Sequence, residues 1–106
     1  MPKYLFQASY STEGVKGIRQ GGGSARRAAV KQVIESVGGK LEAFYFAFGK
    51  SDAIILADLP DNASAAGLSL AVGAVGAATT RTTVLLTPEE IDAAAKKSVD
   101  YRPPGA

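Results

Sequence analysis

The chain has 106 residues and a net charge of +2, with 46% hydrophobic and 21% charged residues, as expected for one globular domain over residues 1–106. It contains no cysteine and no histidine, which excludes disulfides and removes the commonest metal ligands, so we expect no metal and no cofactor. It also lacks long runs of like charge or an apolar segment of membrane-spanning length. We therefore expect a cytoplasmic protein that binds neither nucleic acid nor membranes.

The first part of the chain predicts a strand followed by two helical segments. Residues 3–10, "KYLFQASY", are rich in aromatic and β-forming side chains. Ser11 is placed to cap a short helical turn, which the glycine triplet at 21–23 interrupts. Apolar residues then recur at helical spacing from Ser24, and Gly38-Gly39 ends that helix.

The rest of the chain predicts three more strands and two helices. The segments 40–49 and 52–59 form a hairpin, and Asp61 or Asn62 caps a largely apolar helix that runs to about Ala78. A fourth strand, "TTRTTVLL", leads to "TPEE", where Thr87 and Glu90 form a capping box around a further helix. The final "DYRPPGA" is expected to be extended.

This order predicts an α+β fold: a ferredoxin-like β-α-β-β-α-β arrangement with a four-stranded antiparallel sheet, two helices on one face and an additional C-terminal helix. In that topology the second strand lies at a sheet edge. Here it carries Phe44, Tyr45 and Phe46, which make it apolar on both faces. Because a bare apolar edge invites pairing, we expect a homodimer or larger homo-oligomer that uses this strand and the open sheet face.

Charge favours one hairpin register. A pairing of Phe48 with Asp52 would set Glu42 opposite Asp58, two like charges, whereas a two-residue turn at Lys50-Ser51 pairs Tyr45 with Leu56. The three phenylalanines Phe44, Phe46 and Phe48 then face the helices. The opposite, open face carries Leu5, Gln7, Ser9, Tyr45, Ile54, Leu56, Asp58, Arg81, Thr83 and Leu85. Two such faces packed together leave room for a ligand-sized cleft.

The chain resembles the GYD-domain family of small bacterial and archaeal proteins over most of its length. The resemblance is carried by "EGVKGI", by "RRAAV" leading to "VGGKLEAFYFAFG", by Gly49 and Asp52, by "LPD", and by Gly76 and Thr82. Ser51 stands where the family usually has a tyrosine before the aspartate. The resemblance implies a dimeric α+β barrel domain and no particular reaction.

Two basic features are candidates for anion binding. "GGGSARR" lacks the lysine and the preceding strand of a phosphate-binding loop, which favours a helix break over a phosphate cradle. Arg27 belongs to an outer ion-pair stripe with Lys31 and Glu35, whereas Arg26 lines up with the buried positions of its helix. Arg26 is either an inward arginine paired with Asp58 or the C-terminal carboxylate, or a ligand-binding residue.

The open face offers a second candidate site. Tyr45 and Asp58 are candidate catalytic residues for proton transfer, with Gln7, Ser9 and Arg81 as ligand-binding donors. The alternative is a polar seam in a subunit interface. Two functions follow: a homo-oligomeric binding or regulatory module with a small ligand at the open face, or a cofactor-independent oxygenase or isomerase acting on a small enolisable or aromatic compound. Asp52 is expected to have a structural role in the turn.

Overall fold

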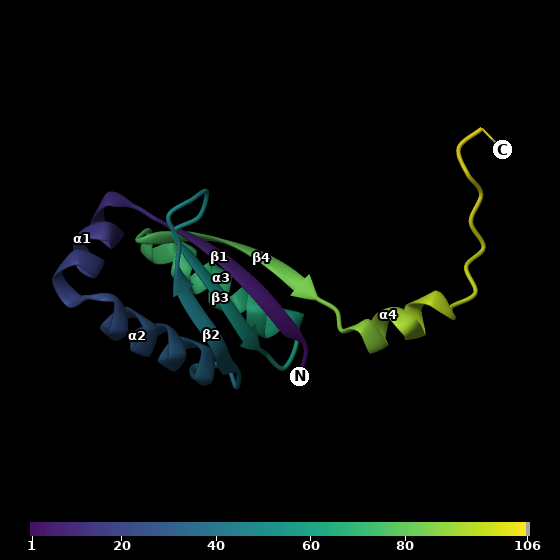
Figure 1. Ribbon diagram of the computed structural model, residues 1–106, viewed down its shortest axis with the longest axis horizontal. Coiled ribbons are helices and arrows are strands. Elements are labelled where there is room, and N and C mark those ends of the chain that lie inside the picture. The colour runs from purple at the N-terminus through teal and green to yellow at the C-terminus, as the bar shows by residue number, and fades with distance from the viewer. Residues whose placement is uncertain (106) are drawn as a thin grey trace.

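The computed structural model describes residues 1–105 and has the predicted order of elements (Figure 1). These are β1 (Lys3–Tyr10), α1 (Thr12–Gly21), α2 (Gly23–Ser36), β2 (Lys40–Phe46), β3 (Ala53–Asp58), α3 (Asn62–Val75), β4 (Ala78–Leu85) and α4 (Pro88–Ala95). The four strands form one antiparallel sheet in the order β2-β3-β1-β4. The predicted ferredoxin-like α+β fold is confirmed, with β2 at an edge of the sheet.

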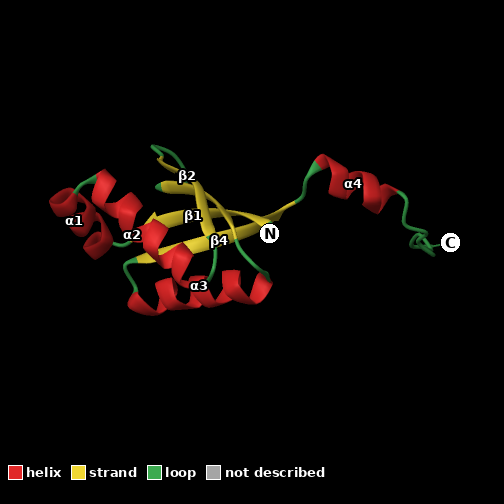
Figure 2. Cartoon of the chain, turned by 90° about the horizontal axis from the view of Figure 1, so that it is seen from below, coloured by secondary structure: helices red, strands yellow, loops and turns green. Residues whose placement is uncertain are grey.

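One face of the sheet packs against the helices and forms the core. Alternate residues of β1, among them Tyr4 and Phe6, are buried there, as are Ile55 and its alternating neighbours in β3. Ile34 from α2 and Leu68 from α3 meet these side chains in one cluster. Figure 2 shows α3 lying along this side of the sheet. The period-two alternation therefore determines which strand residues are buried.

The break between the first two helices falls at Gly22. Its backbone angles, φ 83° and ψ 171°, lie in a region that only glycine adopts readily, so the helix break predicted from the glycine triplet is confirmed. The first helical segment, α1, has 10 residues and is longer than the predicted short turn. Ser11 caps it with a hydrogen bond from the Gly14 amide, and the Ser11 amide donates to the Ala77 carbonyl at 2.9 Å. This contact ties the start of α1 to the beginning of β4.

The predicted hairpin register is wrong. Tyr45 lies opposite Ile54 and not Leu56, a loop from residue 47 to 52 replaces the two-residue turn, and the ladder shifts between Leu41 and Ala43. Repulsion between Glu42 and Asp58 does not decide the register, because Lys3 bonds both carboxylates. Lys3 is distant from both in the sequence. The register thus depends on a third strand.

The faces of β2 and β3 are nevertheless as predicted, with the exception of Phe48. Phe44 and Phe46 lie on the helix side and contact each other edge to face, with ring centroids 5.0 Å apart. Phe48 is 113% exposed, because β2 ends before it and the residue belongs to the loop. Its predicted place in the core is therefore wrong.

Two helical surfaces are left uncovered by this chain. Helix α3 is apolar nearly all round, yet Leu70 on its outer side is 74% exposed and Val75 at its last residue is 79% exposed. Helix α4 stands apart from the sheet and the other helices, beyond the end of β4 (Figure 1, Figure 2). It begins with the predicted capping box of Thr87 and Glu90 and has no buried residue.

Candidate functional site

The open face of the sheet carries the residues that the alternation predicts. Gln7 lies between Ile54 of β3 and Arg81 of β4, and Leu5 lies between Leu56 and Thr83. The assignment of Arg81, Thr83 and Leu85 to this face is confirmed by the β1–β4 register. The face therefore mixes apolar side chains with a central pair of polar ones, Gln7 and Arg81.

Arg81 connects this face to the loop at residues 47–52. Its guanidinium donates a hydrogen bond to the Ser51 hydroxyl at 3.2 Å, and Ser51 is buried, at 5% exposure. The neighbouring Asp52 has the expected structural role, since its carboxylate accepts a hydrogen bond from the Tyr10 amide at 2.9 Å. Ser9 lies opposite Thr79 of β4, two residues beyond Gln7 in β1, and is exposed. The loop is thus anchored to β1 and β4.

Asp58 belongs to an ion cluster at the other end of the same face. Lys3 donates to Asp58 at 2.9 Å and to Glu42 at 2.7 Å. The hydrogen bond to Glu42, followed by that to Asp58, raises the pKa of Lys3 above its usual value. The lysine therefore remains charged and holds the two carboxylates together.

Tyr45 and Asp58 are not brought together. Tyr45 is opposite Ile54, and Asp58 lies four residues farther along β3, a distance of about 13 Å along a strand. Tyr45 is also 70% exposed on the edge strand. With the register corrected, the two side chains share a face without forming an acid–base pair.

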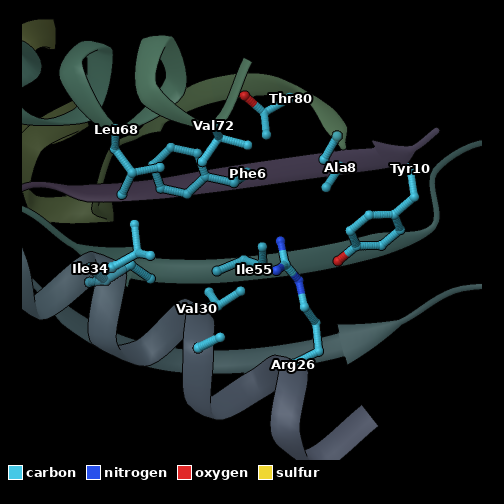
Figure 3. Close-up of a pocket in the computed structure, with 13 residues that line it drawn as sticks. Phe6, Ala8, Tyr10, Arg26, Val30, Ile34, Ile55, Leu68, Val72 and Thr80 are labelled. Carbon is cyan, nitrogen blue, oxygen red and sulfur yellow. The ribbon is translucent and has the colours of Figure 1, made fainter. Parts of the chain in front are cut away.

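Arg26 is a residue of α2 and projects toward the helix-covered face of the sheet. Figure 3 shows its side chain extending from α2 toward the sheet, with the guanidinium group near the Tyr10 ring. The guanidinium carbon lies 5.5 Å from the centre of that ring, a cation–π distance. Among residues 1–105 it forms no ion pair, and Asp58 is held by Lys3 instead. The alternative partner, the C-terminal carboxylate, lies outside the described residues.

A cavity of about 60 Å³ opens beside Arg26, between the sheet, α2 and α3. Its walls are mainly apolar, and Phe6, Val30 and Leu68 are among them. Helical spacing predicts that Arg26 faces inward, but nothing in the sequence indicates this cavity. The contact between Arg26 and Tyr10, the last residue of β1, depends on the position of α2 over the sheet.

The family model described as GYD domain matches residues 4–95. The chain belongs to the GYD domain family. The match takes in all of α1, α2, α3 and α4 and nearly all of the sheet. No curated protein matches the chain.

Two further observations on this GYD domain concern metal-binding clusters and membrane-spanning helices. Within residues 1–105, no three acidic side chains gather as they would around a metal ion. In the same part of the chain, no helix is long and apolar enough to cross a bilayer. The functional candidates are thus the open face, with Gln7 and Arg81 at its centre, and the cavity at Arg26.

Proposed function

We propose that this GYD domain is a homo-oligomeric binding module in which a second copy covers the open sheet face. The observation that carries the proposal is the composition of that face. Leu5, Ile54 and Leu56 form an apolar strip on it, and none of the three is fully buried by this chain. A sheet in a stable fold buries its apolar face against another layer, and the helices occupy only the opposite side.

The electrostatics of the face are compatible with self-association. Asp58 and Glu42 would repel an identical acidic surface, but Lys3 bonds both carboxylates and neutralises one of the two charges, which weakens that repulsion. The edge strand adds Tyr45, which is 70% exposed on the same face and would extend the apolar contact. Phe44 and Phe46 lie on the helix side and do not take part.

Helix α4 supports the same proposal. An isolated helix of eight residues is marginal in water, even with a capping box. It projects from the domain, and Ile91 on it is 50% exposed. Packing of α4 against a second copy would supply the tertiary contacts that its own domain does not provide.

The binding function follows from the polar centre of the face. Gln7, Ser9 and Arg81 would line the space between two apposed sheets, where a small polar ligand could bond to the amide and the guanidinium. Acid–base chemistry is not part of the proposal, since Tyr45 and Asp58 lie too far apart to act as a pair.

Sedimentation equilibrium of two matched variants tests the proposal. Leu56→Arg places a charge in the apolar strip and should convert the oligomer to a folded monomer at micromolar concentration. Leu70→Arg places the same charge on the exposed outer side of α3 and should leave the assembly unchanged. A wild-type chain that sediments as a monomer, or dissociation by the Leu70 variant alone, would contradict the proposal.

A further inference from the structure

The cavity between the sheet and the helices has one polar feature that its apolar walls do not explain. The Nε atom of Arg26 is buried and has no hydrogen-bond partner among the described residues. A buried N–H without an acceptor costs free energy, and more so when the group is charged. The Tyr10 ring compensates only in part, because it contacts the face of the guanidinium and accepts no conventional hydrogen bond.

The surroundings of Arg26 lack an internal anion. None of the residues that line the cavity is acidic, and the polar ones besides Arg26 are Tyr10 and Thr80. An adjoining hollow that Arg26 also lines contains one acidic residue, Glu13 of α1, which forms an ion pair with Lys16. The guanidinium is therefore a cation placed at the entrance of an apolar chamber.

We propose that this cavity binds a small monocarboxylate with an apolar tail. The carboxylate would accept hydrogen bonds from Arg26, which presents N–H groups in the planar arrangement that suits two carboxylate oxygens. The tail would contact Phe6, Ile34 and Val72 at the inner end. A phosphate fits less well, because a doubly charged group needs more donors than one arginine in an apolar chamber supplies.

The size of the cavity limits the tail. Its volume of about 60 Å³ is well below the roughly 150 Å³ of an apolar cavity that accommodates benzene, so the tail is a short aliphatic chain and not a long fatty acid. A shallow groove between α2 and α3, lined by Arg26, Val33 and Val75 among others, leads from Arg26 to the surface. This groove provides a route by which the acid reaches the cavity.

The site is separate from the open face. The cavity lies on the helix side of the sheet, whereas Gln7 and Arg81 lie on the other side, so neither site requires the other. Binding of the acid therefore does not depend on whether a second copy covers the open face.

Butanoate and its uncharged analogue butanamide provide the first test, measured by calorimetry with the full-length protein. Butanoate should bind at least about tenfold more tightly than butanamide, because only the carboxylate pairs with Arg26, and at least about tenfold more tightly than acetate, which lacks two methylene groups of the tail. Equal affinity for butanoate and butanamide, or no binding of butanoate at millimolar concentration, would overturn the proposal.

Two neighbouring arginines provide matched variants. Arg26→Met should weaken butanoate binding at least about tenfold, whereas Arg27→Met, at an exposed position of α2, should leave it unchanged. Arg26→Lys keeps the charge and loses the planar pair of donors, so its affinity should fall between those of the wild type and Arg26→Met. An equal loss in the Arg26 and Arg27 variants would indicate general charge attraction and refute the site.

The location is tested by the methyl signals in nuclear magnetic resonance spectra. Added butanoate should shift the methyl groups of Ile34, Leu68 and Val72, which line the cavity. The methyl groups of Leu5 and Leu56 on the open face should not move. The reverse pattern would place the acid at the open face and contradict the assignment, without bearing on whether the chain forms an oligomer.

Discussion

Replacement of Gly22 by alanine tests the helix break through backbone conformation alone. At φ 83° and ψ 171°, a residue with a Cβ atom is strained by about 1–3 kcal/mol. Apart from its immediate neighbours in the chain, no residue has an atom within 4 Å of the position that this Cβ would occupy, so the cost contains no clash with a distant part of the protein. We therefore expect Gly22→Ala to lower the free energy of unfolding by about 1–3 kcal/mol.

Gly17 is the matched control. It lies inside α1 and has no positive φ, and a Cβ atom at this position would likewise have no neighbour within 4 Å. Alanine is favoured over glycine in a helix by about 0.8–1 kcal/mol, so Gly17→Ala should stabilise the protein by up to that amount. The same chemical change should thus have opposite signs at two positions in and beside one helix.

The assay is equilibrium unfolding in urea, followed by circular dichroism at one fixed protein concentration, because association would otherwise alter the apparent stability. The two variants should differ by about 2–4 kcal/mol, the sum of the two effects. If Gly22→Ala is as stable as Gly17→Ala, Gly22 does not have a positive φ, and α1 and α2 are not separated by a glycine-specific break.

Three further changes test other parts of the fold. Tyr4→Phe removes the hydroxyl that donates to the Asn62 side chain at 2.7 Å and should lower the free energy of unfolding in urea by about 1 kcal/mol. A double-mutant cycle with Asn62→Ala that gives no coupling energy would contradict this hydrogen bond. The hydroxyl and then the amide of Ser64 lower the pKa of Asp61, so its stabilising effect is present above pH 3.8 and is lost as the pH falls through the lower pKa of the folded state. Asp61→Asn should accordingly weaken the loss of stability on acidification, and an unchanged pH profile would refute the capping role. Phe48→Ser should change the free energy of unfolding by less than about 0.5 kcal/mol, because the ring is fully exposed; a larger loss would show that Phe48 is buried in an assembly.

Local features of the sequence were sufficient for the order of elements and for the faces of the strands. The hydroxyl of Ser11, the carboxylate of Asp61 and the capping box at Thr87 each bond within a few residues, so helix starts are visible without a fold. The face of each strand residue follows from period-two alternation, and this is why the assignment of Arg81 to the same face as Gln7 is correct. The inward direction of Arg26 followed in the same way from helical spacing.

The hairpin register and the surroundings of the candidate site depended on contacts between distant segments. Lys3 offsets the repulsion expected between Glu42 and Asp58. It lies 39 residues before Glu42 in the chain and reaches the two carboxylates only after β1 has paired with β3. Likewise, the sequence determined that Arg26 points inward, but its isolation from carboxylates depends on what α2, α3 and the sheet place around it. The physical reason is the same in both cases: alternation and capping are short-range, whereas the energy of a charge depends on every group within a few ångströms, and only the folded chain brings those groups together.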